Sequence, residues 1–243
     1  MLAMDPDGAT IESWLTRREQ GEPLEWILGH AELLGHRLVV DPGVYVPRPQ
    51  SAELAARASD LLPERGHAAD LCTGSGAIAT CLHTAVPSAL VVATELDPLA
   101  ARCARRNGVD VVLCDLDGGL AGAAFDVVTA VAPYVPTGAL HLLPADVQRY
   151  EPARALDGGR DGLDVVRRVV EGAARLLRPG GWLLAEIGGS QDLACAPILD
   201  QAGFATPLFW HDEDGDLRGL AARLVGGVPV RTRATVSGSF SPG

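Results

Sequence analysis

The chain has 243 residues, of which 47% are hydrophobic and 21% charged, enough for one large domain or for a domain with a small extension. Its formal net charge of −11 disfavours tight binding to a nucleic acid, which depends on neutralising phosphates. The sequence has no apolar run of the ~18 residues that a membrane helix needs, and no signal-peptide pattern at the N-terminus. We therefore expect a cytoplasmic protein with no membrane or nucleic-acid partner.

The cysteines and histidines give no sign of a metal site. Five cysteines and six histidines are scattered along the chain, without the close pairs that ligate metals. The odd number of cysteines is typical of reduced, mostly buried thiols. We expect no metal.

Residues 1–50 predict a small N-terminal extension. Apolar residues at helical spacing favour a helix before Gly21, and a second short turn covers 24–28. The apolar residues around Gly35, followed by a turn sequence at 41–43, predict a hairpin over 31–46. This segment is too short for a core of its own, so we expect it to pack on the larger domain that comes after it in the chain.

Residues 51–225 predict one α/β domain. After a helix over 51–62, strands and helices alternate, which is typical of a mostly parallel sheet covered on both faces. The expected strands are 67–71, 90–94, 109–113, 125–130, 181–187, 204–210 and 218–224, and the expected helices are 77–85, 98–107, 164–177 and 191–202. The tail, 226–243, is rich in Gly, Ser, Thr, Arg and Pro, and we expect it to be flexible.

A glycine-bearing loop comes directly after the first strand of this domain. Asp70 closes the strand, Gly74 and Gly76 allow close backbone approach, and a helix begins at Ala77. Such a turn can hold a nucleotide-like ligand at the carboxyl end of a strand. By itself the loop is weak evidence, because ordinary turns have the same pattern.

Acidic residues at the next two strand ends support a nucleoside site. Glu95 lies about twenty residues past the loop, where a carboxylate can accept both hydroxyls of a ribose. Asp115 comes after the third strand and can accept a hydrogen bond from an adenine amino group. The alternatives are a surface carboxylate and a turn cap. Because the third glycine of a dinucleotide loop is absent, S-adenosylmethionine (AdoMet) fits better than a dinucleotide.

Several longer blocks carry a family resemblance. The chain contains, in order, PLEWILGHAELLG, VDPGVYVPRP, DLCTGSGAIA, FDVVTAVAPYV, YEPARALDGGRDGLD, LRPGGWLLAEIG and DEDGDLRGLAAR. Over roughly residues 22–224 it resembles the HemK family of protein-(glutamine-N5) methyltransferases. The block that begins at Tyr150 is the most specific, since generic methyltransferases lack it.

The resemblance implies a class I methyltransferase, a Rossmann-like fold with a seven-stranded sheet and one antiparallel strand at its edge. It implies methyl transfer from AdoMet, with S-adenosylhomocysteine as product. The residues that would hold AdoMet are Asp70, Cys72, Thr73, Gly74, Gly76, Glu95, Leu96, Asp115 and Leu116. Those that would face or bind the acceptor are Arg48, Val131, Ala132, Pro133, Tyr134 and Glu151, with Ala132, Pro133 and Tyr134 as the catalytic set.

The main departure from the family concerns the acceptor. The family's Asn-Pro-Pro-Tyr is Val131-Ala132-Pro133-Tyr134 here. The asparagine oxygen accepts an N–H bond that aims the glutamine amide, and valine accepts none. A buried amide N–H left unpaired costs about 1–3 kcal/mol, and lost alignment adds to that. The Ala132 carbonyl can still serve.

Further departures point the same way, away from methylation of a glutamine amide. Cys72 replaces the loop's first glycine, where it is either tolerated or narrows the methionine pocket. The family's two acids after Arg48 are Gln50 and Ala52, and Arg48 either faces the acceptor or pairs with an acid such as Glu151. The family's helical N-terminal domain, which helps dock a release factor, is reduced here to about thirty residues before the hairpin.

Two other family positions have ordinary structural interpretations. Glu186 is expected to be a buried hydrogen-bonded carboxylate, and Asp214 and Arg218 a turn with an ion pair.

The leading hypothesis is an AdoMet-dependent methyltransferase whose acceptor is a nitrogen of a small molecule or peptide. The alternatives are methylation of a glutamine on a release factor or other protein, and AdoMet binding without turnover. A nucleic-acid adenine methyltransferase is disfavoured by the charge of −11. The oligomeric state stays open.

Overall fold

The computed structural model describes residues 8–226. The tail predicted to be flexible therefore lies, apart from its first residue, outside the described residues. None of the helices within 8–226 combines the length and the apolar character needed to cross a bilayer.

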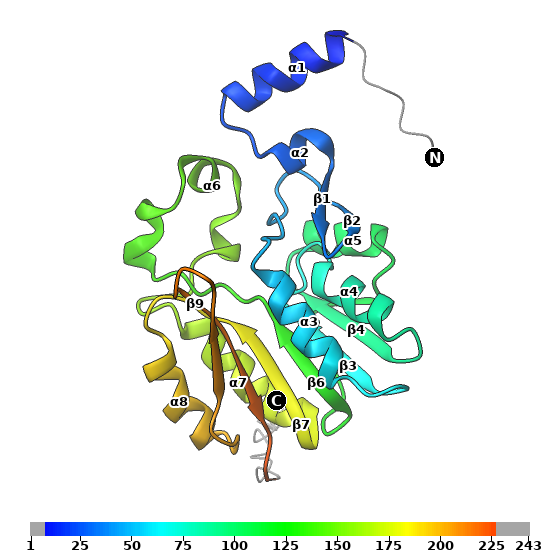
Figure 1. Cartoon of the computed structure of the whole chain (residues 1–243), viewed down its shortest axis with the longest axis vertical. Helices are drawn as coiled ribbons and strands as arrows, with labels where there is room; N and C mark the ends of the chain where they lie inside the picture. Colours follow the sequence, from blue (N-terminus) through cyan, green and yellow to red (C-terminus); the bar gives the residue numbers. More distant parts are fainter. Residues whose placement is uncertain (1–7, 227–243) are drawn as a thin grey trace, which may run out of the picture.

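The domain is built on one seven-stranded sheet (Figure 1). Its strands are β3 (His67–Leu71), β4 (Leu90–Glu95), β5 (Val111–Leu113), β6 (Phe125–Ala130), β7 (Leu177–Glu186), β8 (Leu208–His211) and β9 (Leu217–Arg223), in the order β5-β4-β3-β6-β7-β9-β8. The neighbours from β5 to β7 are parallel, and β9 is antiparallel to both β7 and β8. This is the predicted class I methyltransferase architecture.

The antiparallel strand does not lie at the edge, contrary to the expectation. β9 lies between β7 and the edge strand β8. Leu220, Ala221 and Ala222 of β9 are buried, so this strand needs neighbours on both sides, whereas Leu208 and His211 of β8 are exposed. A short turn joins the two strands as a hairpin, which leaves β8 outermost.

The largest differences from the predicted strand bounds are at the starts of two strands. β7 begins at Leu177 rather than 181, because Leu177 already pairs with Phe125 of β6. A register shift follows, and the regular pairing begins at Trp182. β8 begins at Leu208 rather than 204, because Phe204 forms only an isolated bridge with Leu224.

Helices cover both faces of the sheet. One face carries α3 (Ser51–Leu61), α4 (Ala77–Ala85) and α5 (Pro98–Arg106), and the other carries α7 (Asp164–Leu176) and α8 (Asp192–Gln201). α7 has a buried apolar stripe at helical spacing, with Val166, Val169, Val170 and Ala173 at 1% exposure or less. Burial of such stripes on the sheet forms the main core.

The N-terminal elements pack on the domain only in part. They are α1 (Gly8–Glu19), α2 (Leu24–Leu28), β1 (His30–Leu33) and β2 (His36–Val39), the last two forming the predicted hairpin. Trp26 of α2 and Val44 after the hairpin share a buried cluster with Cys103 of α5. The segment therefore packs on the domain as expected through α2 and the residues after the hairpin, whereas α1 buries no residue and contacts the domain through the ion pair of Arg18 with Asp146. Its Ile11 and Leu15 are exposed because the helix projects beyond α2 (Figure 1).

Short helices that were not predicted lie after β6. They are η1 (Thr137–Leu142), α6 (Ala145–Tyr150) and η2 (Ala153–Ala155). The segment folds back on itself, since Val135 N donates to Leu156 O (3.0 Å) and Gly158 N donates to Val135 O (2.8 Å). It lies with the N-terminal elements beyond the carboxyl ends of the parallel strands (Figure 1).

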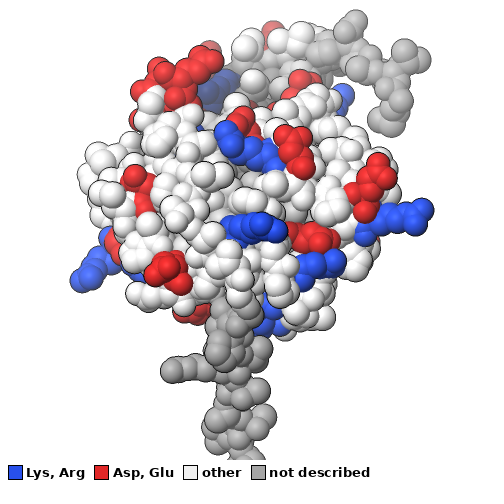
Figure 2. Space-filling view, turned by 60° about the horizontal axis from the view of Figure 1, so that its bottom comes forward, with Lys and Arg blue, Asp and Glu red and all other residues white. Residues whose placement is uncertain are grey.

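The charges on one face of the molecule are mixed. Figure 2 shows acidic and basic side chains interspersed over a largely uncharged surface, with no extended basic patch on that face.

Candidate active site

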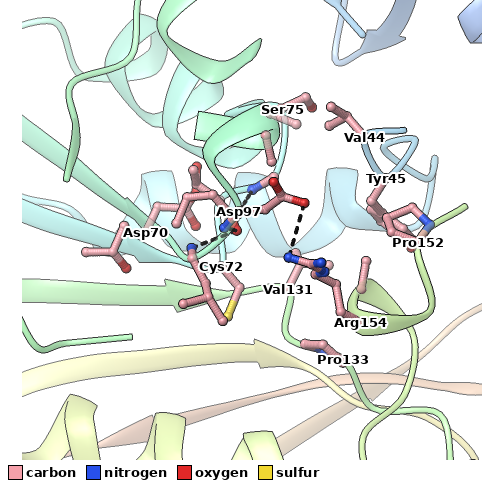
Figure 3. A pocket seen from close by; sticks show the side chains of 18 of the residues that line it. Val44, Tyr45, Asp70, Cys72, Ser75, Asp97, Val131, Pro133, Pro152 and Arg154 are labelled. Carbon is pink, nitrogen blue, oxygen red and sulfur yellow. Dashed lines mark hydrogen bonds and ion pairs between the residues drawn. The ribbon is translucent and has the colours of Figure 1, made fainter. Parts of the chain in front are cut away.

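Two adjoining cavities lie at the carboxyl ends of the parallel strands. One is called the larger cavity because more residues line it, and the other the smaller cavity. The larger cavity is bordered by the loop after β3, the ends of β4 to β6, the segment after the hairpin, η2 and α7 (Figure 3). Of the residues predicted to hold AdoMet, this cavity is lined by Asp70, Cys72, Thr73, Gly74, Glu95, Leu96, Asp115 and Leu116. Gly76 does not line it.

Gly74 and Gly76 of the loop after β3 differ in the space around them. Gly76 caps α4 with φ +84°, and a Cβ there would lie 2.8 Å from Val109 Cγ2 and 3.1 Å from Ala104 Cβ. Gly74 has φ +58°, and a Cβ there would meet nothing within 4 Å. Gly76 is therefore required by packing against α5, whereas Gly74 leaves open space at the cavity.

Cys72 has an unusual backbone for its residue type. Its φ is +56°, in the left-handed region that favours glycine. The sequence departure at this position therefore places a Cβ and a thiol where the family has no side chain. Burial raises the pKa of the Cys72 thiol, so the side chain is a neutral wall of the cavity.

Asp70 holds the loop after β3 through side-chain hydrogen bonds. It is 1% exposed and accepts hydrogen bonds from Thr73 Oγ1 (2.5 Å) and Thr129 Oγ1 (2.7 Å). Burial raises its pKa to about 6, and the two hydroxyl donors oppose that rise. Asp70 thus ties β3 to β6 and to its own loop.

Glu95 holds the loop after β3 through a hydrogen bond to its backbone. Its Oε2 accepts from Gly74 N (2.8 Å), and its Oε1 accepts from Leu96 N and Asp97 N (2.8 Å each). The carboxylate is thus held at the cavity by three backbone donors, out of about four that a carboxylate can accept. Beyond it, Asp115 Oδ2 accepts from Arg168 Nη2 (2.7 Å), and both side chains are about half exposed.

Sequence reasoning missed several residues of the larger cavity. Tyr45 comes from the segment after the hairpin, and Arg154 from η2. Arg154 Nη1 lies 3.6 Å from Asp97 Oδ2, across the cavity (Figure 3). Both family blocks, VDPGVYVPRP and YEPARALDGG, contained a signal for these positions, but no local chemistry marked them.

Two hydroxyls of the larger cavity have no partner. Ser75 Oγ and Thr94 Oγ1 are buried and make no hydrogen bond within the described chain. Buried polar atoms are normally paired, so these two mark a place where a polar ligand can bind.

The smaller cavity shares a wall with the larger one. Val131, Tyr45 and Ala155 border both. Its other lining residues are Arg48, Gln50, Ala132, Tyr134, Val135, Leu143, Pro144, Asp146, Val147 and Leu156. The tetrapeptide 131–134 therefore divides its side chains: Ala132 and Tyr134 line the smaller cavity, and Pro133 the larger.

Arg48 and Glu151 are engaged with each other. Arg48 Nη2 donates to Glu151 Oε1, and the Arg48 guanidinium lies 5.0 Å from the centre of the Tyr45 ring. Arg48 borders the smaller cavity and Glu151 lies behind it, with its Oε2 buried and unpaired within the described chain. Of the two possibilities for Arg48, the ion pair with Glu151 is present, and it does not stop Arg48 from facing the cavity.

Two of the ordinary interpretations need adjustment. Glu186 is buried (5% exposed), and a hydrogen bond from Ser51 partly offsets the burial that raises its pKa. Its Oε1 has no partner in the described chain, so the expected hydrogen bonding is only partial. Arg218 pairs with Asp212 and Asp216 rather than with Asp214, because the turn directs those two carboxylates toward it.

Within residues 8–226 no group of three or more His, Cys, Asp or Glu side chains could hold a metal ion.

Comparison with known proteins identifies the family. The chain is 37% identical to the release factor glutamine methyltransferase of Geobacter sulfurreducens, over 89% of this chain and 78% of that protein. It is 40% identical to the protein of the same name from Moorella thermoacetica, over 78% and 70%. The chain belongs to the HemK family of methyltransferases.

Another relative within this similarity has a different acceptor in its name. The 4-amino-L-phenylalanine/4-methylamino-L-phenylalanine methyltransferase of Streptomyces pristinaespiralis is 40% identical, over 78% of this chain and 68% of that protein. The HemK-type chain is thus an AdoMet-dependent methyltransferase.

Solved structures agree on the fold of this HemK-type chain. A methyltransferase from Pyrococcus furiosus superposes with a TM-score of 0.57 at 19% identity, covering 88% of this chain and all of that one. The ribosomal protein L11 methylase of Lactobacillus delbrueckii also gives 0.57, at 18% identity, covering 77% and 84%. No protein-family model matches the sequence.

Proposed function

We propose that this protein transfers a methyl group from AdoMet to a nitrogen of a small molecule or peptide. The larger cavity would take AdoMet and the smaller one the acceptor. When bound, AdoMet supplies a methyl group already activated by its sulfonium, so the protein's task is alignment.

The lining of the larger cavity fits AdoMet. The space above Gly74 is open, and the backbone-held carboxylate of Glu95 keeps about one acceptor position for a ribose hydroxyl. Asp115 would face the adenine. The unpaired hydroxyls of Ser75 and Thr94 offer further polar partners. Much of the remaining lining is apolar, as is usual for a nucleoside pocket.

Val131 is the observation that supports a diverged acceptor. It stands on the wall shared by the two cavities, where the family's asparagine would orient a glutamine amide. An amide nitrogen is a poor nucleophile, and without that oxygen one N–H loses its partner. The relative from Streptomyces pristinaespiralis is named for a small amino acid, which supports a small-molecule acceptor for this chain as well.

Within this proposal the protein's own groups orient the acceptor. The Ala132 carbonyl would accept one N–H of the acceptor, and the Tyr134 side chain would form a wall of the site beside the acceptor nitrogen. Arg48, held by Glu151 and stacked on Tyr45, would fix the far end of the site.

Methylation of a glutamine on a release factor is the second candidate. The 37% identity to the Geobacter protein supports it. In that case the Ala132 carbonyl would have to align the amide without the asparagine.

Calorimetric titration with AdoMet and with S-adenosylhomocysteine tests the proposal. We expect the wild type to bind both, and Glu95→Ala to bind about 10–100-fold more weakly, since a charged hydrogen bond contributes about 1.5–3 kcal/mol. Glu64→Ala, an exposed carboxylate away from both cavities, is the matched control and should bind as the wild type does. No binding by the wild type, or equal binding by both variants, would refute the assignment of the site.

A further inference from the structure

We propose that the acceptor is an aromatic amine, with its nitrogen attached directly to a ring and its body in the smaller cavity. The inference rests on the proposed methyl transfer from AdoMet and names the acceptor's chemical class.

The walls of the smaller cavity suit a flat apolar body. Val131, Val135, Leu143, Val147 and Leu156, all from the segment after β6, provide aliphatic surface. Tyr45 and Tyr134 add two aromatic side chains, which favour offset or edge contacts with a ring. A long polar glutamine side chain would leave most of this surface without apolar contacts.

The lining of this cavity contains no free base. Its tyrosines stay protonated, because burial raises the pKa of Tyr134 to about 12 and that of Tyr45 further. Arg48 is a cation and Gln50 a neutral amide.

The one carboxylate among the lining residues is already engaged. Asp146 Oδ1 accepts from Val147 N (3.0 Å), and its Oδ2 lies 3.7 Å from Arg18 Nη1. Glu151 and Glu186 line neither cavity. Arg48 donates a hydrogen bond to Glu151, and Ser51 donates one to Glu186.

Without a free base in its lining, the smaller cavity favours an acceptor nitrogen that is already neutral at pH 7. An alkylamine is protonated at neutral pH and must lose a proton before its lone pair can react, which needs a base. An aromatic amine is neutral at pH 7 and needs none. A carboxamide is also neutral, but its lone pair is delocalised and Val131 cannot help to orient it.

The chemistry balances without any further group. The amine lone pair forms the new N–C bond, and the bond between the methyl carbon and sulfur breaks with its electrons remaining on sulfur. The nitrogen then carries an extra proton, which it releases to water, because an N-methylated anilinium ion is acidic enough to be mostly deprotonated at pH 7.

The test uses three acceptors that share one ring and differ only in the nitrogen: aniline, benzylamine and benzamide. The full chain is assayed with AdoMet carrying a labelled methyl group, and binding of each compound is titrated into the protein loaded with S-adenosylhomocysteine. We expect kcat/KM for aniline at pH 7 to exceed that of both others by at least about tenfold, equivalent to 1.4 kcal/mol. Between pH 7 and 9 the value for benzylamine should rise about tenfold per unit with its neutral fraction, while that for aniline stays flat.

Variants at Val131 sharpen the test. Val131→Asn should weaken aniline binding and turnover by about tenfold and raise turnover of benzamide, because it places a polar amide in the apolar wall. Val131→Thr has the same volume and serves as the matched control for shape, with a smaller effect expected.

The outcomes separate this inference from the proposed function. Preference for benzylamine or benzamide, or methylation of a glutamine peptide with aniline unmodified, would overturn the aromatic amine while leaving methyl transfer in place. Binding of AdoMet with no aniline turnover would also overturn it. Failure to bind AdoMet would overturn both.

Discussion

Asp97 and Arg154 face each other across the larger cavity, with 3.6 Å between Asp97 Oδ2 and Arg154 Nη1 (Figure 3). Asp97 is anchored, because it caps α5 by accepting from Leu99 N (2.9 Å). Arg154 belongs to η2, in the folded-back segment after β6. The pair therefore links the two sides of the proposed cofactor cavity.

Arg154→Glu should loosen that link. Two facing carboxylates repel, so we expect AdoMet to dissociate about three- to tenfold faster, while the free energy of unfolding changes by less than about 1 kcal/mol because Arg154 is exposed. Stopped-flow fluorescence measures the dissociation rate. Arg102→Glu makes the same charge change on the exposed side of α5, and an equal effect from it would contradict a local role for Arg154.

Cys72→Gly should relieve the loop. A non-glycine residue in the left-handed region costs about 1–2 kcal/mol, partly offset by the greater unfolded-state entropy of glycine, so we expect a gain of up to about 1 kcal/mol. Removal of the side chain also widens the cavity, and AdoMet should bind more tightly. Urea unfolding and calorimetry measure the two effects. Cys72→Ser keeps the Cβ and should show neither gain; equal gains in both variants would rule out the backbone explanation.

Gly76→Ala and Gly74→Ala should separate stability from binding. At Gly76 the new Cβ meets Val109 and Ala104, so we expect a loss of about 2–4 kcal/mol from overpacking added to backbone strain. At Gly74 the Cβ meets nothing, so only the strain of about 1–2 kcal/mol applies, but the methyl group enters the proposed cofactor cavity and should weaken AdoMet binding. The reverse order of stability losses would show that the assigned contacts at Gly76 are wrong.

Asp70 should make stability fall as pH rises. Its pKa is raised from 3.8 to about 6 in the folded protein, so the folded state holds the proton more tightly than the unfolded state does. The free energy of unfolding should therefore decline between pH ~4 and ~6, by roughly 3 kcal/mol in all, and then level off. Denaturation at a series of pH values, for the wild type and Asp70→Asn, gives the difference curve. Parallel curves would mean that Asp70 does not titrate in this range.

Local pattern in the sequence determined the central features of this protein. Alternating apolar segments predicted the parallel sheet and its helices, because burial on the two faces imposes that periodicity. The loop at Gly74 and the acid at Glu95 were both predicted to hold AdoMet, and the Gly74 N–Glu95 Oε2 bond joins them at one edge of the sheet. The substitution at Val131 was also visible as a departure from a known motif.

The tertiary structure decided what depends on contacts between distant segments. It placed β9 inside the sheet, left α1 projecting from the domain, and brought Tyr45 and Arg154 to the same cavity as the loop after β3. It also chose the partners of Arg48 and Arg218. Periodicity records only whether a residue is buried, whereas the pairing of side chains depends on how whole elements pack, which a local pattern does not contain.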